Sequence, residues 1–236
     1  MHKKSDHYWI SMSDIMTGLM VIFMFISVAY ILQLKQQQKE RNQILEEYKN
    51  VKMALFNELQ KEFENDFKKE RWDAIIGEDL TIRFKNEKVL FDYNKSDLRP
   101  QFKNILDNFF TRYFTILLKA PYKKHIAEVR IEGHTDSWGD YLYNLRLSYE
   151  RTQSVLQYFF ESPSSPYYTL NEDDKKIVRF WLTATGFSWG RVLDSDGNFV
   201  LESGKKENRM QSRRVEFKIV TKSDAIVKTI LDTMGN

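Results

Sequence analysis

The feature that most constrains this chain is an uncharged stretch near its N-terminus, residues 15–34, which reads IMTGLMVIFMFISVAYILQL. A helix needs about 20 mostly apolar residues to cross a bilayer, and this stretch meets that length. A cleavable signal peptide is the alternative, but the run is long for one and continues into LKQQQKE without a small-residue cleavage site. We therefore expect a short cytoplasmic segment, 1–8, followed by a transmembrane helix over residues 9–34.

The flanking charges do not fix the orientation of this helix. Lys3 and Lys4 favour a cytoplasmic N-terminus, but Lys35, Lys39 and Arg41 follow the apolar stretch on its other side. Over the whole chain 36 Lys and Arg nearly balance 33 Asp and Glu, so no basic block indicates a nucleic-acid partner. Cysteine is absent, which excludes disulfides, thiolate metal sites and a cysteine nucleophile.

Asp14 is the only charged residue between His7 and Leu34. A carboxylate in or near hydrocarbon is costly, so such a residue is a candidate functional site. Asp14 is therefore a candidate for accepting an ion from one side of the membrane and releasing it to the other. Because one helix cannot form a pathway, a partner with more membrane helices is implied. The alternative is that Asp14 only caps the helix or reaches the interface, about one turn inside Trp9.

The next segment, residues 35–77, predicts a helical stalk. It has no Gly or Pro before residue 73, and its apolar residues recur at helical spacing, at Ile44, Tyr48, Val51, Leu55, Leu59 and Phe63. This stripe is narrow, which favours pairing with a second copy of the chain. A single solvated helix that leads to the next domain is the alternative.

The rest of the chain, residues 78–236, predicts one α+β domain. Short strands are expected at 80–84, 88–91, 126–132, 178–185 and 214–220, and helices at 96–118, 141–160 and 225–234. This order of strands and helices indicates an α+β sandwich. The fold class is therefore a single N-terminal transmembrane helix and helical stalk, followed by an α+β domain.

Polar residues cluster between the strand at 126–132 and the helix at 141–160. Asp136 lies in a glycine-flanked loop, and Asn144, Ser148 and Arg151 recur on one face of the helix that follows. Arg151 offers a two-pronged fit to a carboxylate and Asp136 could bind an ammonium group, so the pair suits a zwitterionic amino-acid end. The alternative is a structural pair between Asp136 and Arg151 that closes the loop.

Other polar motifs predict no catalysis. His134 is expected to be a hydrogen-bonding loop residue, because no two His have metal-ligand spacing, and no metal site is expected. Residues 194–198 resemble part of a calcium loop, but Lys205 stands where the distal Glu belongs, so a hairpin turn is expected. The chain has no phosphate-binding loop or nucleophile elbow, so we expect neither a cofactor nor an enzyme.

The domain resembles the OmpA-like family of peptidoglycan-binding domains over residues 80–221. The matching positions are 91–96, 133–136, Gly139, Tyr143, Asn144, Leu147, Ser148, Arg151, Val155 and 213–217. The resemblance implies a fold that holds the diaminopimelate of a peptidoglycan stem peptide, with Asp136 and Arg151 as its carboxylate-and-arginine pair. It also implies that Asn144, Thr135 and Asn94 belong to the same pocket.

The chain departs from that family near the rim of the pocket. Asn208 and Ser212 replace the usual Gly and Asn of the closing motif, and segments 161–176 and 189–207 are longer than usual.

The N-terminal helix resembles that of the MotB family of stator subunits. Trp9 and the sequence Asp14-Ile-Met-Thr17 carry the resemblance, which implies that Asp14, together with Thr17, conducts ions. A membrane helix, a stalk and an OmpA-like domain are the architecture of MotB and of its relative ZorB, the stator-like subunit of the Zorya anti-phage system. The short segment before the membrane, the uninterrupted stalk and the two insertions favour the ZorB type.

This resemblance implies that two copies of the chain lie inside a ring, expected to be pentameric, of multi-span subunits of the MotA or ZorA kind. The chain would cross the bacterial inner membrane once, with a cytoplasmic N-terminus and a periplasmic domain bound to peptidoglycan. Ion flow, of protons rather than sodium, would turn the ring while the wall holds the dimer. The alternatives are a flagellar stator, a passive tether between membrane and wall, and a TolR-like energy transducer.

Overall fold

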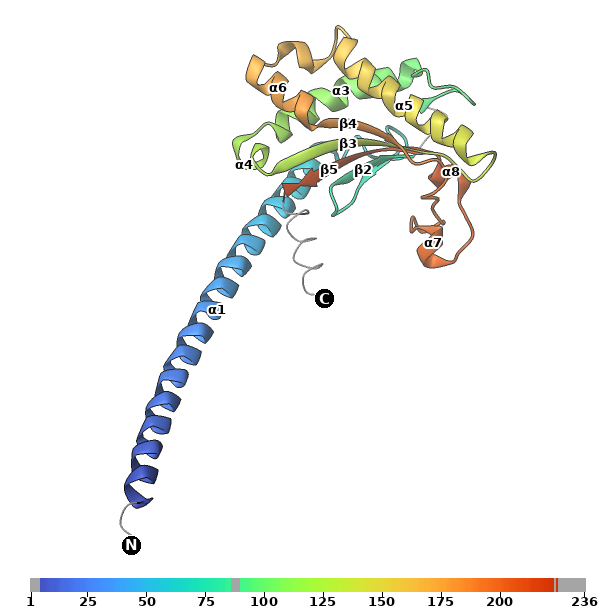
Figure 1. Cartoon of the computed structure of the whole chain (residues 1–236). Helices are drawn as coiled ribbons and strands as arrows, with labels where there is room; N and C mark the ends of the chain where they lie inside the picture. The colour runs from blue at the N-terminus through green and yellow to red at the C-terminus, as the bar shows by residue number, and fades with distance from the viewer. Residues whose placement is uncertain (1–4, 86–89, 223, 225–236) are drawn as a thin grey trace. The chain divides into compact units, whose positions relative to one another are not determined.

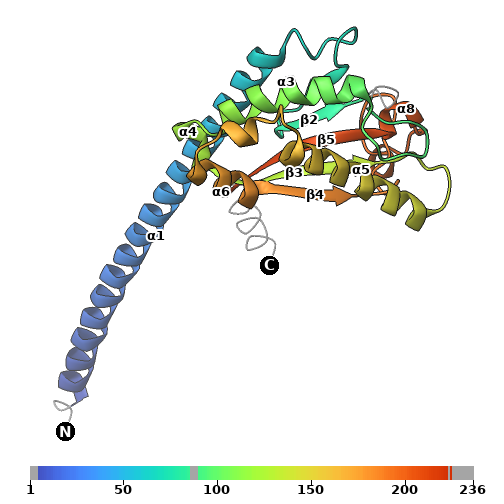
Figure 2. The same cartoon turned by 90° about the horizontal axis from the view of Figure 1, so that it is seen from above.

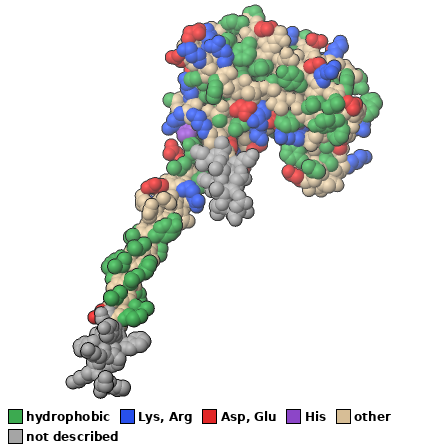
Figure 3. Space-filling view, in the orientation of Figure 1, with side chains coloured by type: hydrophobic (Ala, Val, Ile, Leu, Met, Phe, Trp, Pro, Cys, Tyr) green, Lys and Arg blue, Asp and Glu red, His purple; other side chains and the backbone are tan. Residues whose placement is uncertain are grey.

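The computed structural model describes residues 5–85, 90–222 and 224, and the chain divides into two units, Met1–Glu47 and Tyr48–Asn236. Helix α1 (Ser5–Phe63) begins in the first unit and ends in the second. In the first unit its large apolar side chains are exposed, including Phe23, Phe25 and Leu32. They form a hydrophobic surface along the visible face of the helix (Figure 3). No other described residue of this unit covers that surface, so it needs an apolar environment from outside the unit.

The stalk expected to be helical over 35–77 is shorter than predicted. Helix α1 ends at Phe63, and strand β1 (Ala74–Ile76) follows. The second half of the apolar stripe needs no second copy of the chain to bury it. Its side chains Leu55, Leu59 and Phe63 are already buried in the core of the second unit. Ile44, in the first unit, remains exposed. The helical prediction is therefore confirmed up to Phe63, but the apolar side chains of residues 55–63 pack against this chain's own domain.

The second unit is built on a five-stranded sheet in the order β1-β2-β5-β3-β4. Its other strands are β2 (Thr81–Phe84), β3 (Ile126–His134), β4 (Leu182–Gly186) and β5 (Arg214–Thr221). Neighbouring strands are antiparallel except for β3 and β4, which are parallel. A parallel pair requires a crossover, and α5 (Tyr141–Glu161) lies within it. The α+β fold expected from the sequence is confirmed.

One face of the sheet carries the helices. Figures 1 and 2 both show α3 (Pro100–Leu117) and α5 over this face. Inward-facing side chains of the central strands meet aromatic side chains of α3, as in the 4.9 Å ring contact between Phe109 and Phe217. The C-terminal part of α1 closes this core, where Phe63 lies 5.4 Å from Phe109. Burial of aromatic rings is the main source of stability in such a layer.

Two predicted elements differ from the structure. The strand expected at 178–185 begins only at Leu182, because residues 172–181 form helix α6 (Glu172–Trp181). The side chain of Asn171 caps this helix by accepting from the backbone N–H of Asp174. The helix expected at 96–118 begins at Pro100, which suits the first helical turn. Residues 88 and 89 of the strand expected at 88–91 lie outside the described residues, and Phe91 forms only an isolated antiparallel bridge with Leu98. The helix expected at 225–234 also lies outside the described residues.

Short elements complete the described chain. They are α4 (Ala120–Lys123), η1 (Pro166–Thr169), α7 (Val200–Ser203) and α8 (Arg209–Ser212). Both α7 and α8 belong to the long connection between β4 and β5. Figure 1 shows α7 beside the sheet face that the large helices leave open.

Candidate functional site

Helix α1 is, within the described residues, the one helix long and apolar enough to cross a membrane. Asp14 and Thr17 lie three residues apart on it, and therefore on one side. The Thr17 hydroxyl donates to the carbonyl of Ser13 at 2.8 Å. The Asp14 carboxylate has no hydrogen-bond or ion-pair partner in the described part of the chain, and its apolar neighbours Ile15 and Met16 are exposed. Its solvation has to come from water or from another chain.

A second candidate site is a cavity of about 350 Å³ in the domain. The residues that line it are Tyr93, Asn94, Thr135, Asp136, Trp138, Gly139, Tyr143, Asn144, Leu147, Arg151, Arg209 and Arg213. All five residues that the sequence assigned to a peptidoglycan pocket are among them. They come from three separate stretches of the chain, which the fold brings together at one end of β3.

The loop that carries Asp136 is fixed by the start of α5. Asp140 caps the helix by accepting from the backbone N–H of Tyr143 at 2.9 Å. The side-chain amide of Asn144 donates to the carbonyls of Trp138 and Asp140, at 2.9 and 3.0 Å. Gly133 lets α5 approach the strand, because a Cβ there would collide with the carbonyl of Ser148. Asn144 therefore shapes the loop as well as lining the cavity.

Asp136 pairs with Arg213 and not with Arg151. One of its carboxylate oxygens lies 2.8 Å from Nη1 of Arg213, and the other accepts from the backbone N–H of Trp138 at 3.3 Å. The structural pair between Asp136 and Arg151, which the sequence left open as an alternative, is therefore wrong. Asp136 and Arg151 line the same cavity, and different residues hold each of them in place. This arrangement suits binding of the ammonium and the carboxylate of a zwitterion.

Arg151 is held by the loop around Asn94. Its Nε donates to the carbonyl of Lys95 at 3.0 Å, and its guanidinium lies 4.9 Å from the centre of the Phe91 ring. Asn94 itself has a left-handed backbone with φ of 55°, which Asn tolerates better than most residues. The side chain of Arg151 is buried, so its position on the cavity wall is well defined.

Several residues of the cavity were missed by sequence reasoning. Arg213 stands in the motif that carried the family resemblance, and that motif was the signal for it. Arg209 lies in the region where the sequence departs from the family, so no pattern pointed to it. Tyr93 and Trp138 are exposed at the rim, 72 % and 64 %, and provide apolar surface beside the charged groups.

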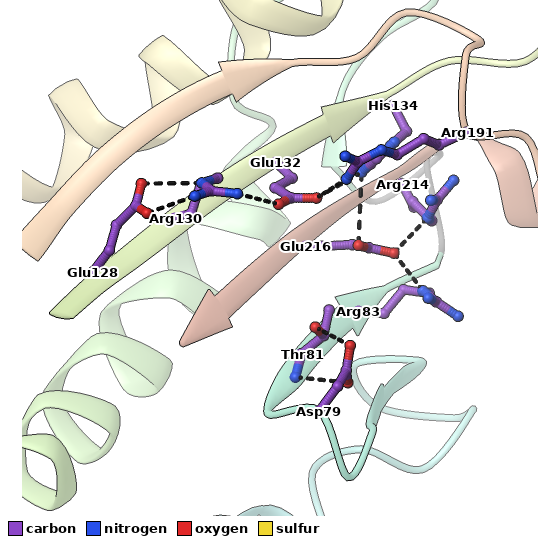
Figure 4. A network of polar contacts seen from close by, with 10 residues as sticks. All are labelled: Asp79, Thr81, Arg83, Glu128, Arg130, Glu132, His134, Arg191, Arg214 and Glu216. Carbon is purple, nitrogen blue, oxygen red and sulfur yellow. Dashed lines mark hydrogen bonds and ion pairs between the residues drawn. The ribbon is translucent and has the colours of Figure 1, made fainter. Parts of the chain in front are cut away.

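A buried ion network lies on the open face of the sheet, as Figure 4 shows. The carboxylate of Glu216 accepts from Nε of Arg83 and of Arg214, at 2.5 and 2.6 Å. Burial by itself would raise the pKa of Glu216, but the positive charges of Arg214 and Arg83 outweigh burial and lower the pKa to about 2. Glu132, also buried, lies 3.4 Å from Arg130 and 3.3 Å from Arg191.

His134 is the last residue of β3 and lies inside this network, not in a loop as expected. Its Nε2 is 3.6 Å from a carboxylate oxygen of Glu132 and 3.6 Å from one of Glu216, and neither ring nitrogen makes a hydrogen bond to another described residue. Burial lowers the pKa of His134. Ligand atoms of these three residues lie within 4.8 Å of one another, a spacing that a metal ion could fill. Four guanidinium groups already neutralise the two carboxylates, so we assign the cluster to structure.

The fold and the cavity define a class of protein: an OmpA-like domain joined to a helix able to cross a membrane. The family model described as the OmpA family matches residues 90–197. The crystal structure of a putative MotB-like protein from Desulfovibrio vulgaris has the same fold, with a TM-score of 0.50 and 22 % sequence identity. The match covers 75 % of this chain and 94 % of that one.

Curated relatives narrow this class. The chain is 36 % identical to the Zorya protein ZorB of Escherichia coli (Crooks strain), over 97 % of this chain and 94 % of the relative. It is 26 % identical to the ZorB of Escherichia coli O139:H28, over 90 % of this chain and 79 % of the relative. This chain belongs to the ZorB family, and the resemblance to MotB and ZorB noted in the sequence is confirmed.

Proposed function

We propose that this chain is the stator-like subunit of an ion-driven inner-membrane motor that is anchored to peptidoglycan and serves anti-phage defence. One observation carries the proposal: the same chain has a carboxylate in an apolar helix with no partner among the described residues, and a cavity lined by both Asp136 and Arg151. Similarity to ZorB over nearly the whole chain supports this combination.

The cavity would anchor the chain by binding the diaminopimelate of a stem peptide. The ammonium group of the diaminopimelate would bind Asp136, and its carboxylate would bind Arg151. The other predicted residues, Thr135, Asn144 and Asn94, line the same cavity. Arg213 already forms an ion pair with Asp136. The ligand's ammonium would therefore have to share the Asp136 carboxylate with the Arg213 guanidinium or displace that guanidinium. Both groups are held by the fold before the ligand arrives, which reduces the entropy lost on binding.

Asp14 would carry the ion, and Thr17 would contribute an oxygen on the same side of α1. Because one helix cannot enclose a pathway, the ring of multi-span partner subunits would supply the rest of it. Two copies of this chain would take turns in accepting a proton. The neutral and charged forms of Asp14 would contact the ring differently, and this difference would drive rotation. The N-terminus would lie in the cytoplasm and the domain in the periplasm.

The experiment separates the two sites in cells that carry this chain together with its multi-span partner and are challenged with phage. Asp14→Asn should abolish protection while sacculus pull-down stays unchanged, because the fold of the domain does not depend on Asp14. Asp136→Ala should weaken pull-down at least tenfold, since a charge-assisted bond is worth about 1.5–3 kcal/mol. Asp97→Ala, an exposed acid outside the cavity, is the matched control.

Two results would reject parts of this proposal. Full protection by Asp14→Asn would remove ion transport and leave a passive tether. Undiminished pull-down by Asp136→Ala would remove the wall-binding role of the cavity. Protection against phage by the wild type is itself the readout that separates defence from a flagellar role.

A further inference from the structure

The charged groups that line the cavity are unequal in number. Arg151, Arg209 and Arg213 are three guanidinium groups, and Asp136 is the one carboxylate among the lining residues that the structure describes. A zwitterionic amino-acid end brings one carboxylate and one ammonium group, which would match Arg151 and Asp136. The lining therefore offers more positive charge than such an end can use.

Arg209 differs from the other two arginines in what holds it. Arg151 donates to a loop carbonyl and Arg213 pairs with Asp136. Arg209 is exposed, and its guanidinium has no hydrogen-bond or ion-pair partner among residues 5–85, 90–222 and 224. The nearby acid Glu207 is engaged elsewhere, because its carboxylate accepts from the backbone N–H and the hydroxyl of Ser137.

Arg209 is nevertheless fixed in place by its backbone. It is the first residue of α8, and the cap residue Asn208 accepts from the backbone N–H of Gln211 at 3.3 Å. The backbone N–H of Asn208 also donates to the carbonyl of Leu193 at 2.7 Å. The backbone of Arg209 is thus held in place, while its guanidinium is exposed to solvent. Such a side chain is well suited to bind an anion on the wall of the cavity.

We infer that Arg209 binds a second carboxylate of the stem peptide, so that the site selects peptides whose diaminopimelate has both of its carboxyl groups free. This inference rests on the proposed wall-binding function and adds its ligand preference. The amino-acid end of the diaminopimelate occupies Asp136 and Arg151, and its other carboxylate, at the peptide's C-terminal side, meets Arg209. Stem peptides with that carboxyl group amidated are poor ligands.

The test measures binding of two synthetic tripeptides, L-Ala-γ-D-Glu-meso-diaminopimelate with its C-terminal carboxyl group free or amidated, to the full chain in detergent. The wild type should bind the free acid about tenfold more tightly, as expected for one charge-assisted contact. Arg209→Gln should lose this preference by weakening only the free acid. Arg146→Gln removes the same charge from an exposed arginine outside the cavity and should keep the preference.

Equal affinity of the wild type for the two tripeptides would overturn the inference, as would a preference that survives Arg209→Gln. Loss of the preference in Arg146→Gln as well would also overturn it, because the effect would then be one of net charge. If the wild type binds neither tripeptide and Asp136→Ala still binds sacculi normally, the proposed function fails, and this inference fails with it.

Discussion

Asp14 and Glu216 are two carboxylates of this chain whose surroundings differ. Glu216 is buried in the domain, and Arg83 and Arg214 supply the charge that it needs. Asp14 stands among exposed apolar side chains, with no partner in the described part of the chain. The first carboxylate has a complete environment and serves the fold. For the second, the described residues provide no such environment, as the proposed ion-carrying role of Asp14 requires.

The largest expected effect separates these two carboxylates by stability. Glu216→Leu should lower the free energy of unfolding of the domain by about 3–5 kcal/mol, because it removes the carboxylate partner of the buried Arg214 and of the half-buried Arg83. Asp14→Leu should leave that free energy unchanged. Urea unfolding of the full chain in detergent, followed by tryptophan fluorescence, measures both. A change for Asp14→Leu of the same size as that for Glu216→Leu would break the comparison.

Truncating an apolar side chain should affect the stability of the domain in the part of α1 that belongs to the second unit but not in the part that belongs to the first. Leu59→Ala should cost about 2–5 kcal/mol, because it opens a cavity in the aromatic core. Ile44→Ala should change the free energy of unfolding by less than about 0.5 kcal/mol, since its side chain is exposed. The same unfolding measurement applies. A large loss for Ile44→Ala that depends on protein concentration would instead show that this part of the helix pairs with a second copy.

Acid should weaken the domain through its ion network. The pKa of Glu216 is about 2 in the folded chain and 4.5 in the unfolded chain. Its stabilisation, roughly 3 kcal/mol, is thus present above pH 4.5 and lost as the pH falls towards 2. His134 adds to this trend, because burial lowers its pKa below the unfolded value of 6.5, and acid therefore favours the unfolded state. Unfolding midpoints that stay constant from pH 6.5 to 2.5 would contradict this account.

The smallest expected effect lies at the edge of the same network. The side chain of Arg191 is 41 % exposed while it contacts the buried Glu132 at 3.3 Å. Because water screens this pair and Arg130 remains beside Glu132, Arg191→Gln should cost no more than about 1 kcal/mol. Thermal unfolding of the variant beside Glu216→Leu measures the difference. A loss as large as that of Glu216→Leu would mean that the connection after β4 is essential to the network.

Local patterns in the sequence were sufficient to predict much of the secondary structure and part of the candidate site. Hydrophobic periodicity located α1, α5 and β3, and the resemblance to the OmpA-like family predicted five of the residues that line the cavity. Periodicity was insufficient at residues 178–181, where a short apolar pattern suits either a strand or the last turn of a helix. The Asn171 cap and the acidic first turn of α6 were the overlooked signals.

By itself, the sequence determined that an uncharged stretch long enough to cross a membrane directly follows one acid, Asp14, because length and charge are properties of neighbouring residues. Only the tertiary structure decided that Asp136 pairs with Arg213, that Leu59 is buried by its own domain, and that Arg209 joins the cavity. These contacts join residues far apart in the chain. They depend on which strands pair and in which register, and no local pattern encodes that choice.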